Sequence, residues 1–287
     1  MGVICKKNPQ NLLFSVYLLQ SMMSKVALVT GASSGIGRAF AERFFLRGYK
    51  VVLVGRVQEK LDEVIGNLKG EGEAHACVCD VSVVEDCQKA IDSCITKFGK
   101  LDILVNCAGC MFFTLMKSQK VDDWHKMIDA NCKGVVNMCG LAIPHFLENS
   151  KDDKHIINIS SDAARTLFPA LAVYNASKVF VQTFSKSLRC ELVNTNVRVT
   201  DLQPGDCRTN LVMNNTDTDA LGKVGVAGGE LVGGNSEADM DRTMVLDPED
   251  VVDAGCYAID AKSHIGVHEI LIEPRNQLFG DPTSVNA

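Results

Sequence analysis

Three features typical of other protein classes are missing from this chain of 287 residues. No basic run is present, and the formal net charge of −6 gives no support to nucleic-acid binding. No apolar stretch approaches the roughly 20 residues that span a bilayer, so no transmembrane segment is predicted. There is one CxxC motif, with no second one and no His pair nearby, so a structural zinc site is not indicated.

The overall composition is that of an ordinary globular protein. Hydrophobic residues make up 46% of the chain and charged residues 22%, and the length is sufficient for one well-buried α/β domain. The 12 cysteines are scattered over the predicted strands and helices and do not have the compact spacing of a disulfide framework. We therefore expect free thiols in a reducing compartment and a cytoplasmic location.

The N-terminal segment has a different character. Lys6 and Lys7 precede an apolar stretch from Leu12 to Leu19, which is too short to cross a membrane and is not followed by a small-residue cleavage site. We expect residues 1–22 to be a dispensable extension, with an upstream start codon as one origin, and residues 23–287 to form a single domain. A peripheral membrane contact by the extension is the alternative.

The segment KVALVTGASSGIGRAFAERFFLRGY combines a strand, a glycine-rich turn and a helix. Lys25 to Thr30 reads as a short buried strand, glycines follow, and apolar residues then recur at helical spacing up to Gly48. Glycines let the backbone approach a pyrophosphate, and the unpaired N–H groups of a helix N-terminus favour negative charge. The segment therefore predicts a dinucleotide site, with a plain glycine-rich turn as the alternative.

A second pattern lies further along the chain. Tyr174 and Lys178 are four residues apart in a stretch that reads as a helix, so their side chains share one helix face. The Lys178 ammonium is expected to lower the pKa of the Tyr174 phenol, which would then exchange protons at neutral pH. Ser161, at the end of an apolar run, would hold the reacting oxygen. A Tyr-x-x-x-Lys pair is weak evidence alone, so this interpretation depends on the glycine-rich loop.

Together these motifs resemble those of the short-chain dehydrogenase/reductase family, in its single-domain branch. TGASSGIG matches the TGxxxGxG loop of that branch, and NCAG resembles NNAG, with Cys107 in place of the second Asn. The thirteen-residue spacing to Tyr174 selects Ser161 over Ser160. The resemblance runs from about Lys25 to Asn276 and includes every signature segment.

The resemblance implies hydride transfer between a nicotinamide and a carbonyl carbon. Its catalytic residues would be Ser161, Tyr174, Lys178 and Asn131, with Tyr174 as proton donor and Asn131 holding a relay water behind Lys178. The implied cofactor contacts are Gly31, Ser33, Gly35, Ile36, Gly37, Asp80, Asn106, Ala108, Gly109, Tyr174, Lys178, Pro204, Gly205 and Thr209. Among these, Asp80 is expected at the adenine and Thr209 at the nicotinamide carboxamide.

The choice of nicotinamide cofactor can be argued from charge. The second predicted strand ends at Gly55, close to the position where an NAD-specific site carries an acid for the ribose 2′-hydroxyl. The next residue is Arg56, and a guanidinium can pair with a 2′-phosphate. We therefore predict NADP(H) rather than NAD(H). The alternative is that Arg56 covers the adenine or pairs with an acid such as Glu59. A second arginine, Arg38, lies in the first predicted helix, and we interpret it as a surface residue.

Alternating strands and helices predict an α/β fold in which helices cover both faces of a parallel sheet. Strands are expected at residues 25–30, 50–55, 73–79, 101–106, 154–160, 196–203 and 267–273. The resemblance implies a Rossmann-type doubly wound sheet of about seven strands, in the order 3-2-1-4-5-6-7, between two layers of helices. The cofactor would cross the carboxyl ends of the strands.

The substrate side is predicted from composition. Residues 209–245 are rich in Gly, Asn and Asp, which indicates a mobile lid over the substrate, with a plain surface insertion as the alternative. An apolar pocket is expected from Met111, Phe112, Phe113, Phe168, Leu171, Leu211 and Met213. Such a pocket favours an apolar ketone, aldehyde or secondary alcohol. Arg165 has two interpretations, a partner for a substrate carboxylate and a surface residue, of which the second is favoured.

The predicted function is NADP(H)-dependent interconversion of a small carbonyl compound and an alcohol. The ending HEILIEPRNQ is similar to the subgroup that oxidises 3-hydroxy acids and serine-like substrates, so such acids remain an alternative, as do steroid-like or retinoid-like alcohols. A non-catalytic NADP(H)-binding scaffold is a further one. A homodimer or homotetramer is expected through the helices carrying Asn131 and Tyr174. The reason is an apolar stripe of Phe180, Phe184 and Leu188, which core packing would also explain.

Overall fold

The computed structural model describes residues 24–148, 152–212, 215, 217–223, 226–227, 230–231 and 245–277. The extension predicted over residues 1–22 lies outside these ranges. So do Met213 of the predicted pocket and much of the predicted lid at 209–245.

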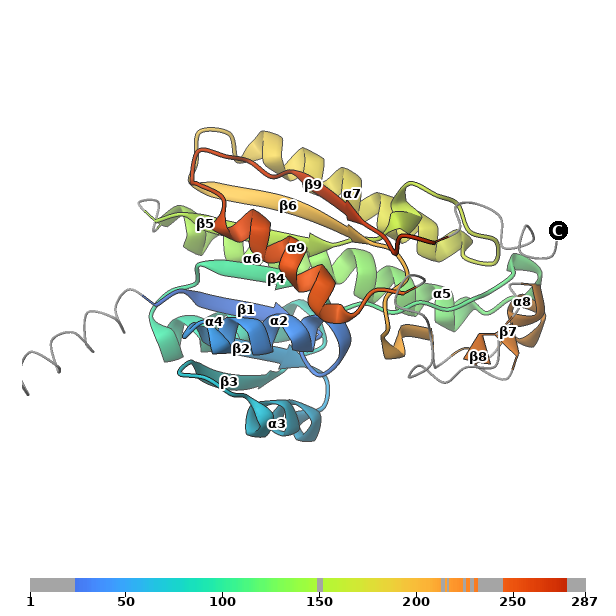
Figure 1. Ribbon diagram of the computed structural model, residues 1–287, viewed down its shortest axis with the longest axis horizontal. Coiled ribbons are helices and arrows are strands. Elements are labelled where there is room, and N and C mark those ends of the chain that lie inside the picture. Colours follow the sequence, from blue (N-terminus) through green and yellow to red (C-terminus); the bar gives the residue numbers. More distant parts are fainter. Residues whose placement is uncertain are drawn as a thin grey trace, which may run out of the picture.

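A seven-stranded parallel sheet forms the centre of the fold (Figure 1). In sheet order its strands are β3 (Glu73–Val78), β2 (Lys50–Gly55), β1 (Val26–Thr30), β4 (Ile103–Asn106), β5 (Lys154–Ile159), β6 (Val197–Pro204) and β9 (Glu269–Ile272). This confirms the predicted order, in which the direction of winding reverses between β1 and β4. At such a reversal the loops leave in opposite directions and open a crevice at the carboxyl ends of the strands.

Helices cover both faces of the sheet, as expected for a doubly wound fold. One face carries α2 (Gly35–Leu46), α3 (Gln58–Asn67) and α9 (Pro248–Asp260), and the other carries α4 (Val84–Phe98), α6 (Gly134–Glu148) and α7 (Ala172–Glu191). Alternate residues of β1 belong to opposite layers, since Ala27 and Val29 pack with α2 and α9, while Val26 and Leu28 pack with α4 and α6. Burial on both faces explains why these strands read as continuous apolar runs.

Shorter elements complete the described part of the chain. They are α5 (Val121–Ile128), a π-helical turn (Asp129–Lys133), three 3-10 turns (Met116–Ser118, Asp162–Ala164 and Asn210–Val212), α8 (Thr218–Lys223) and a small antiparallel ribbon of β7 (Val226–Ala227) and β8 (Glu230–Leu231). None of the described helices has the length and apolar character needed to cross a bilayer.

The predicted strand over 101–106 begins at Ile103, two residues later than expected. Asp102 lies at its start and is buried among polar partners. Its carboxylate accepts hydrogen bonds from the Val26 N–H at 2.9 Å and from Lys154 Nζ at 2.7 Å, and it pairs with Lys100 at 2.9 Å. The amino ends of β1, β4 and β5 are therefore joined by one buried ionic cluster.

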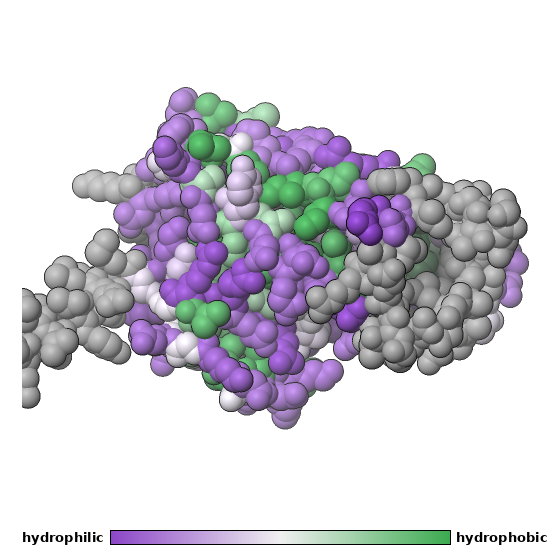
Figure 2. All heavy atoms as spheres, in the orientation of Figure 1, coloured by the Kyte–Doolittle hydropathy of each residue, from purple (hydrophilic) through white to green (hydrophobic). Residues whose placement is uncertain are grey.

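The edge strand β9 is only partly covered. Leu271 is exposed, and Ile270 and Ile272 are half-buried. Figure 2 shows apolar side chains gathered around this strand on the side of the molecule that it displays. An open strand edge of this kind has unpaired backbone groups that can pair with another chain.

All eleven cysteines within the described residues are free thiols. Five of them are buried, and burial holds the pKa of Cys94 and of Cys139 at about 12. Five others are half-buried. Cys190, near the end of α7, is exposed.

Candidate active site

The carboxyl ends of the central strands bring together four segments that were predicted separately. A side-chain carbon placed on Gly31 would lie 2.9 Å from the Ala108 backbone, and one placed on Gly35 would lie 3.1 Å from the Thr209 side chain. The Ser161 hydroxyl lies 3.4 Å from the Pro204 carbonyl oxygen. The glycine-rich loop, the NCAG segment, the serine loop and the PGxxxT segment thus form one site.

The glycine-rich loop has the geometry of an anion cradle. Gly31 has a φ of +67°, a conformation that L side chains rarely adopt, and a Cβ on Gly37 would overlap the Gly31 carbonyl oxygen. Helix α2 begins at Gly35 with no side-chain cap and no acidic residue in its first turn. Its first N–H groups therefore remain available to a phosphate, and these residues fit a dinucleotide.

The backbone of the NCAG segment is held by hydrogen bonds to the Thr30 side chain at the end of β1. Thr30 Oγ1 accepts hydrogen bonds from the N–H groups of Cys107 and Ala108, each at 3.0 Å. Asn106 Nδ2 donates to Asn158 Oδ1 at 2.9 Å, which joins β4 to β5. Because Cys107 contributes its backbone, the substitution in the NNAG pattern leaves this arrangement intact. Burial raises the pKa of the Cys107 thiol to about 12, so it stays protonated.

Ser161, Tyr174 and Lys178 converge beyond the end of β5. Tyr174 and Lys178 lie on α7, and only 5% of Tyr174 is exposed. Lys178 Nζ lies 5.5 Å from the centre of the Tyr174 ring and donates to the Ile159 carbonyl at 3.1 Å. The Ser161 hydroxyl lies close enough to the Tyr174 phenol to act on its pKa. The three residues that the spacing picked out therefore form one cluster.

The electrostatics of the cluster differ from the expectation. Burial raises the pKa of Tyr174 above its ordinary value, and although the Ser161 hydrogen bond opposes this shift, the charge of Asp162 adds to it. Burial also lowers the pKa of Lys178. The predicted lowering of the Tyr174 pKa by Lys178 is therefore not found, because burial has the largest effect on the pKa of both groups. The phenol therefore carries its proton at neutral pH.

Asn131 lies in the π-helical turn behind the NCAG segment, and 1% of it is exposed. Its Oδ1 accepts from the Cys110 N–H at 2.9 Å, and its Nδ2 donates to the Cys110 carbonyl at 2.9 Å and to Ser177 Oγ at 3.0 Å. A Cβ on Gly109 would lie 2.8 Å from Asn131 Oδ1 and 3.9 Å from Lys178 Nζ. Asn131 thus lies beside Lys178, and π-helical turns are frequent at functional sites.

The residues predicted near the adenosine end of the cofactor differ in the ion pairs and hydrogen bonds that they make. Arg56 follows β2, is exposed, and makes no ion pair with Glu59 or any other described residue. Arg38 pairs with Glu42 at 2.7 Å on the surface of α2, in agreement with its interpretation as a surface residue. Asp80 Oδ1 accepts from the N–H and hydroxyl of Ser82, at 2.9 and 2.7 Å, and so shapes the turn before α4.

Two residues at the site were not predicted from the sequence. Asp162 accepts a hydrogen bond from Ser161 Oγ at 2.7 Å, and Gln277 donates to the other Asp162 oxygen. Gln277 Oε1 accepts from the Asp206 N–H at 2.8 Å and occupies the space where Gly205 would carry a Cβ. Adjacency to Ser161 was a signal for Asp162. No local pattern marks Gln277, which lies 115 residues away from Asp162 in the chain.

The predicted apolar pocket is only partly assembled in the described residues. Phe112, Met127, Ala163 and Leu171 are buried in one cluster with Tyr174, and Met111, Phe113 and Phe168 pack against it half-buried. Leu211 is exposed. Asn215 and Asp217, within the predicted lid, accept hydrogen bonds from the N–H groups of Phe113 and Leu115, so these pieces of the lid segment lie against the same loop.

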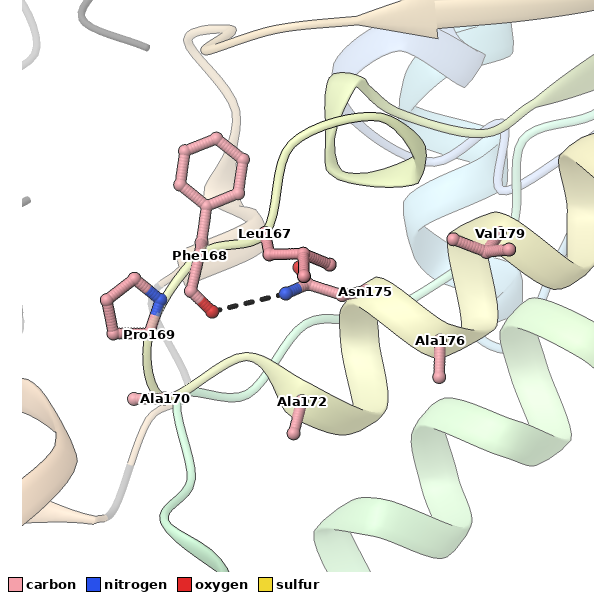
Figure 3. A pocket seen from close by; sticks show the side chains of 8 residues that line it. All are labelled: Leu167, Phe168, Pro169, Ala170, Ala172, Asn175, Ala176 and Val179. Carbon is pink, nitrogen blue, oxygen red and sulfur yellow. Dashed lines mark hydrogen bonds between the residues drawn. The ribbon is translucent and has the colours of Figure 1, made fainter. Parts of the chain in front are cut away.

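An open apolar cleft of about 590 Å³ lies beside this cluster (Figure 3). Its lining comes from the loop before α7 and the first turns of that helix: Leu167, Phe168, Pro169, Ala170, Ala172, Asn175, Ala176 and Val179. Asn175 Nδ2 donates to the Phe168 carbonyl at 3.1 Å and fixes the loop on the helix (Figure 3). None of the four catalytic candidates, Ser161, Tyr174, Lys178 and Asn131, lines this cleft, so it is distinct from the reacting centre.

Arg165 pairs with neighbouring strands at the surface, in agreement with the second of its two predicted interpretations. Its guanidinium donates to Gln203 Oε1 and to Glu269 Oε2, the latter at 2.7 Å. Lys186 also pairs with Glu269, at 3.2 Å. The Arg165 Nε and Nη2 groups are engaged by β6 and β9, which favours the surface role over that of a partner for a substrate carboxylate.

Comparison with known proteins agrees with this geometry. A family profile described as short chain dehydrogenase matches residues 25–220, which is more than half of the chain. The chain belongs to the short-chain dehydrogenase family. As a family member with this fold and glycine-rich loop, it is an NAD(P)-dependent oxidoreductase.

Two relatives show the range of activities among short-chain dehydrogenases that resemble it. Sulfoacetaldehyde reductase 2 of Chromohalobacter salexigens is 36% identical over 259 residues, which cover 90% of this chain and 97% of that protein. Glycine betaine reductase of Emericella nidulans is 38% identical over 257 residues, which cover 89% of this chain. The match spans only 19% of that longer protein, about a fifth of its length.

Solved structures of other short-chain dehydrogenases are similar as well. A closed form of serine dehydrogenase complexed with NADP+ has a TM-score of 0.75 at 31% identity, covering 88% of this chain and 96% of that one. The 3-ketoacyl-(acyl-carrier-protein) reductase of Brucella melitensis, complexed with NADH, has a TM-score of 0.74 at 30% identity, covering 88% and 98%.

Proposed function

We propose that this short-chain dehydrogenase interconverts a carbonyl compound and an alcohol with NADP(H), and that Tyr174 is its acid/base. The observation that carries the proposal is the meeting of Ser161, Tyr174 and Lys178 beside the glycine-rich loop. The bound nicotinamide would supply or accept the hydride. The residues of this chain would bind and orient the reactants and move the proton.

Each catalytic candidate has a distinct task in this proposal. Tyr174, which burial keeps protonated, gives its phenolic proton to the carbonyl oxygen during reduction. Ser161 orients the phenol and the reacting oxygen, and the buried Lys178 puts positive charge near the phenolate that forms. General acid catalysis of this kind contributes about 10²- to 10⁴-fold to a rate.

The preference for NADP(H) is supported by the exposed and unpaired Arg56 guanidinium and by the missing acid at the end of β2. Asp80, Asn106, Ala108, Gly109, Pro204, Gly205 and Thr209 would complete the cofactor contacts around Gly31, Ser33, Gly35, Ile36 and Gly37. Steady-state KM values test the preference. We expect a lower KM for NADPH than for NADH, and the reverse order would contradict it.

For the substrate we propose an apolar ketone, aldehyde or secondary alcohol of small to medium size. Support comes from the apolar cluster of Phe112, Ala163 and Leu171 around Tyr174, and from Asn215 of the predicted lid, which accepts a hydrogen bond from the Phe113 N–H. Serine-like hydroxy acids are the second candidate, because a serine dehydrogenase is among the similar structures. The engagement of Arg165 by Gln203 and Glu269 weighs against a carboxylate at that position.

The test is NADPH oxidation against aldehydes, diketones, steroids, retinoids and sulfoacetaldehyde, with NADP+ reduction by L-serine and 3-hydroxy acids. For any active compound, Tyr174→Phe should lower kcat/KM by about a thousandfold, because the phenolic proton is lost while the ring remains. Tyr257→Phe is the matched control, since Tyr257 lies exposed on α9. NADPH affinity, followed by the fluorescence of the bound nucleotide, should be unchanged in both variants.

Two results would reject the proposal. Full turnover by Tyr174→Phe would remove Tyr174 from the mechanism. A wild-type protein that binds NADPH tightly yet is inert on every class of compound would favour the non-catalytic scaffold.

We propose a homodimer or homotetramer as the working form. On α7, 41% of Phe180 is exposed and its ring stacks on Phe184 at 6.0 Å, which leaves an apolar surface beside the cleft. Leu188, the third residue of the predicted stripe, belongs to the core instead. Light scattering after size exclusion tests the assembly, and a monomer would refute it. A cytoplasmic location is part of the proposal and is supported by the free thiols.

A further inference from the structure

The cleft beside α7 has the lining of a site for an uncharged molecule. None of its eight lining residues is charged, and Asn175 is the only one of them with a polar side chain. The volume of about 590 Å³ lies within the range of about 300–1,000 Å³ in which proteins take up small molecules. Size and charge therefore suit a neutral ligand with an apolar body.

Asn175 gives this cleft an unsatisfied hydrogen-bond acceptor. Only 5% of the residue is exposed, and its Nδ2 donates to the Phe168 carbonyl at 3.1 Å, which sets the orientation of the amide. Its Oδ1 is buried and has no hydrogen-bond partner among the described residues. An acceptor buried in this way is unfavourable, because it has lost its bonds to water and gained none in return. A ligand with a donor group would supply the missing bond.

Leu167 lies at the approach to this oxygen. It lines the cleft together with Asn175, and in Figure 3 its side chain and the Asn175 amide overlap. Leu167 is 74% exposed, so few contacts hold its side chain in one rotamer. A turn of this side chain into solvent would open Asn175 Oδ1 to a molecule in the cleft.

We propose that the cleft is a second ligand site, selective for neutral apolar alcohols, in which the ligand hydroxyl donates to Asn175 Oδ1. An alcohol brings the donor that this acceptor lacks, whereas the corresponding ketone or aldehyde brings none. An amine would carry a charge at neutral pH, and an amide would bring a carbonyl for which the other lining side chains offer no donor. The cleft therefore takes the alcohol, and not the carbonyl compound, of the proposed reaction.

The cleft shares a wall with the reacting centre. Phe168 lines the cleft and also packs against the cluster that contains Tyr174, and Asn175 follows Tyr174 on α7. Between them lies Ala170, whose φ of +59° is uncommon for a residue with a side chain and whose carbonyl accepts from the Thr114 N–H at 2.7 Å. A ligand against this loop should alter substrate binding more than the chemical step. This effect on turnover rests on the proposed function, whereas binding to the cleft does not.

Binding is tested with 1-methylcyclohexanol and the full-length protein. This tertiary alcohol has no hydrogen on its carbinol carbon, so it cannot be oxidised by hydride transfer. Its methyl ether keeps the ring and the oxygen but lacks the donor. Trp124, the only tryptophan, reports on the loop by its fluorescence, because its Nε1 donates to Thr114 Oγ1 at 2.8 Å. We expect a saturable change with the alcohol and binding of the ether at least about fivefold weaker.

Three variants locate the bound alcohol. Ala176 is exposed on α7 and lines the cleft, so Ala176→Phe fills the cleft without entering the core and should weaken alcohol binding at least about tenfold. Asn175→Ala removes the acceptor, so the alcohol should bind only as well as the ether does. Ser187→Phe is the matched control, because Ser187 is exposed on the same helix outside the cleft, and it should bind the alcohol as the wild type does.

The effect on turnover is measured with a compound found active in the panel above. In the wild type, 1-methylcyclohexanol should change KM by about twofold or more, with kcat changed less. The change in KM should level off when the cleft is saturated, whereas competition at the reacting centre would raise KM without limit. Ala176→Phe should abolish the effect, and Ser187→Phe should retain it.

The outcomes separate this inference from the proposed function. If the alcohol binds with this selectivity but no compound is turned over, the proposed function fails and the second site stands. If the wild type turns over a compound but binds alcohol and ether equally, or if Ala176→Phe binds the alcohol normally, the inference alone is overturned. The last two measurements decide the matter even if Asn175→Ala does not fold.

A second copy of the chain is the other occupant that the test detects. Light scattering of the wild type and of Ala176→Phe compares their assembly. If the substitution splits a wild-type assembly and the alcohol does not bind, the cleft is a contact between subunits and the inference is overturned.

Discussion

The two halves of the sheet build their parts of the site in different ways. In the nucleotide half, from β1 to β4, backbone atoms make most of the contacts. Glycines allow close approach, the α2 N-terminus has no side-chain cap, and the N–H groups of Cys107 and Ala108 donate to the Thr30 side chain. In the catalytic half, from β5 to β9, the contacts are made by side chains. Ser161, Asp162 and Gln277 form a hydrogen-bonded series there.

The two kinds of site tolerate different substitutions. A backbone cradle is lost when a side chain is added, whereas a side-chain network is lost when one is removed. The halves meet at the amino ends of the strands, in the buried cluster of Asp102, at the start of β4, and Lys154, at the start of β5.

The largest effect is expected at the junction. Lys154→Met leaves Asp102 buried with Lys100 as its remaining ionic partner, and breaking a buried pair costs about 3 kcal/mol or more. Denaturant unfolding should show this loss of stability in one cooperative transition if the halves fold together. Lys117→Met is the control, since its pair with Asp219 is exposed and should contribute less than about 1 kcal/mol. Equal losses in the two variants would contradict the prediction.

The same variant has a defined pH dependence. Burial opposes ionisation of Asp102, but hydrogen bonds from Lys154, Lys100 and Val26 outweigh it and hold its pKa below the ordinary value. A lowered pKa contributes stability above the unfolded value of about 3.9 and loses it as the pH falls toward the folded value. In Lys154→Met the Asp102 pKa should rise, so the acid decline of Tm should begin at higher pH than in the wild type.

The next effect is in the glycine-rich loop. In Gly37→Ala the new methyl group meets the Gly31 carbonyl, and overpacking of this kind costs about 1–3 kcal/mol. We expect NADPH affinity to fall by about ten- to a hundredfold in calorimetric titration. Gly66→Ala, where no heavy atom lies within 4 Å of the new methyl group, should leave affinity unchanged. Wild-type affinity in Gly37→Ala would show that the loop is not a rigid cradle.

The smallest effect is at Arg56. Arg56→Gln removes an exposed guanidinium, so we expect the KM for NADPH to rise about five- to tenfold while the KM for NADH changes little. Arg38→Gln serves as control, because Arg38 is engaged by Glu42. A larger effect at Arg38 than at Arg56 would place the 2′-phosphate elsewhere.

The sequence predicts the nucleotide half, which is built by backbone, better than the catalytic half, which is built by side chains. Local patterns were sufficient for the parallel sheet between helices and for the strand, turn and helix of the glycine-rich loop, because these parts are adjacent in sequence. The strand order came from the family resemblance. The clustering of Tyr174, Lys178 and Ser161 was also predicted, since helical spacing and a family resemblance link them, and their catalytic roles stay predictions. Gln277 was missed because its contact with Asp162 closes across 115 residues. The direction of the Tyr174 pKa was missed because it depends on burial, which no local pattern reveals.

The exposed Cys190 on α7 gives this protein a built-in point of attachment for a chemical label. In a chain that starts at Met23, Cys5 is absent, and the remaining thiols are partly or fully covered by the fold. A spin label on Cys190 would travel with the helix that carries Tyr174. In an assembly of identical copies, the distance between two such labels would measure how those helices are arranged, with no residue of the reacting centre altered.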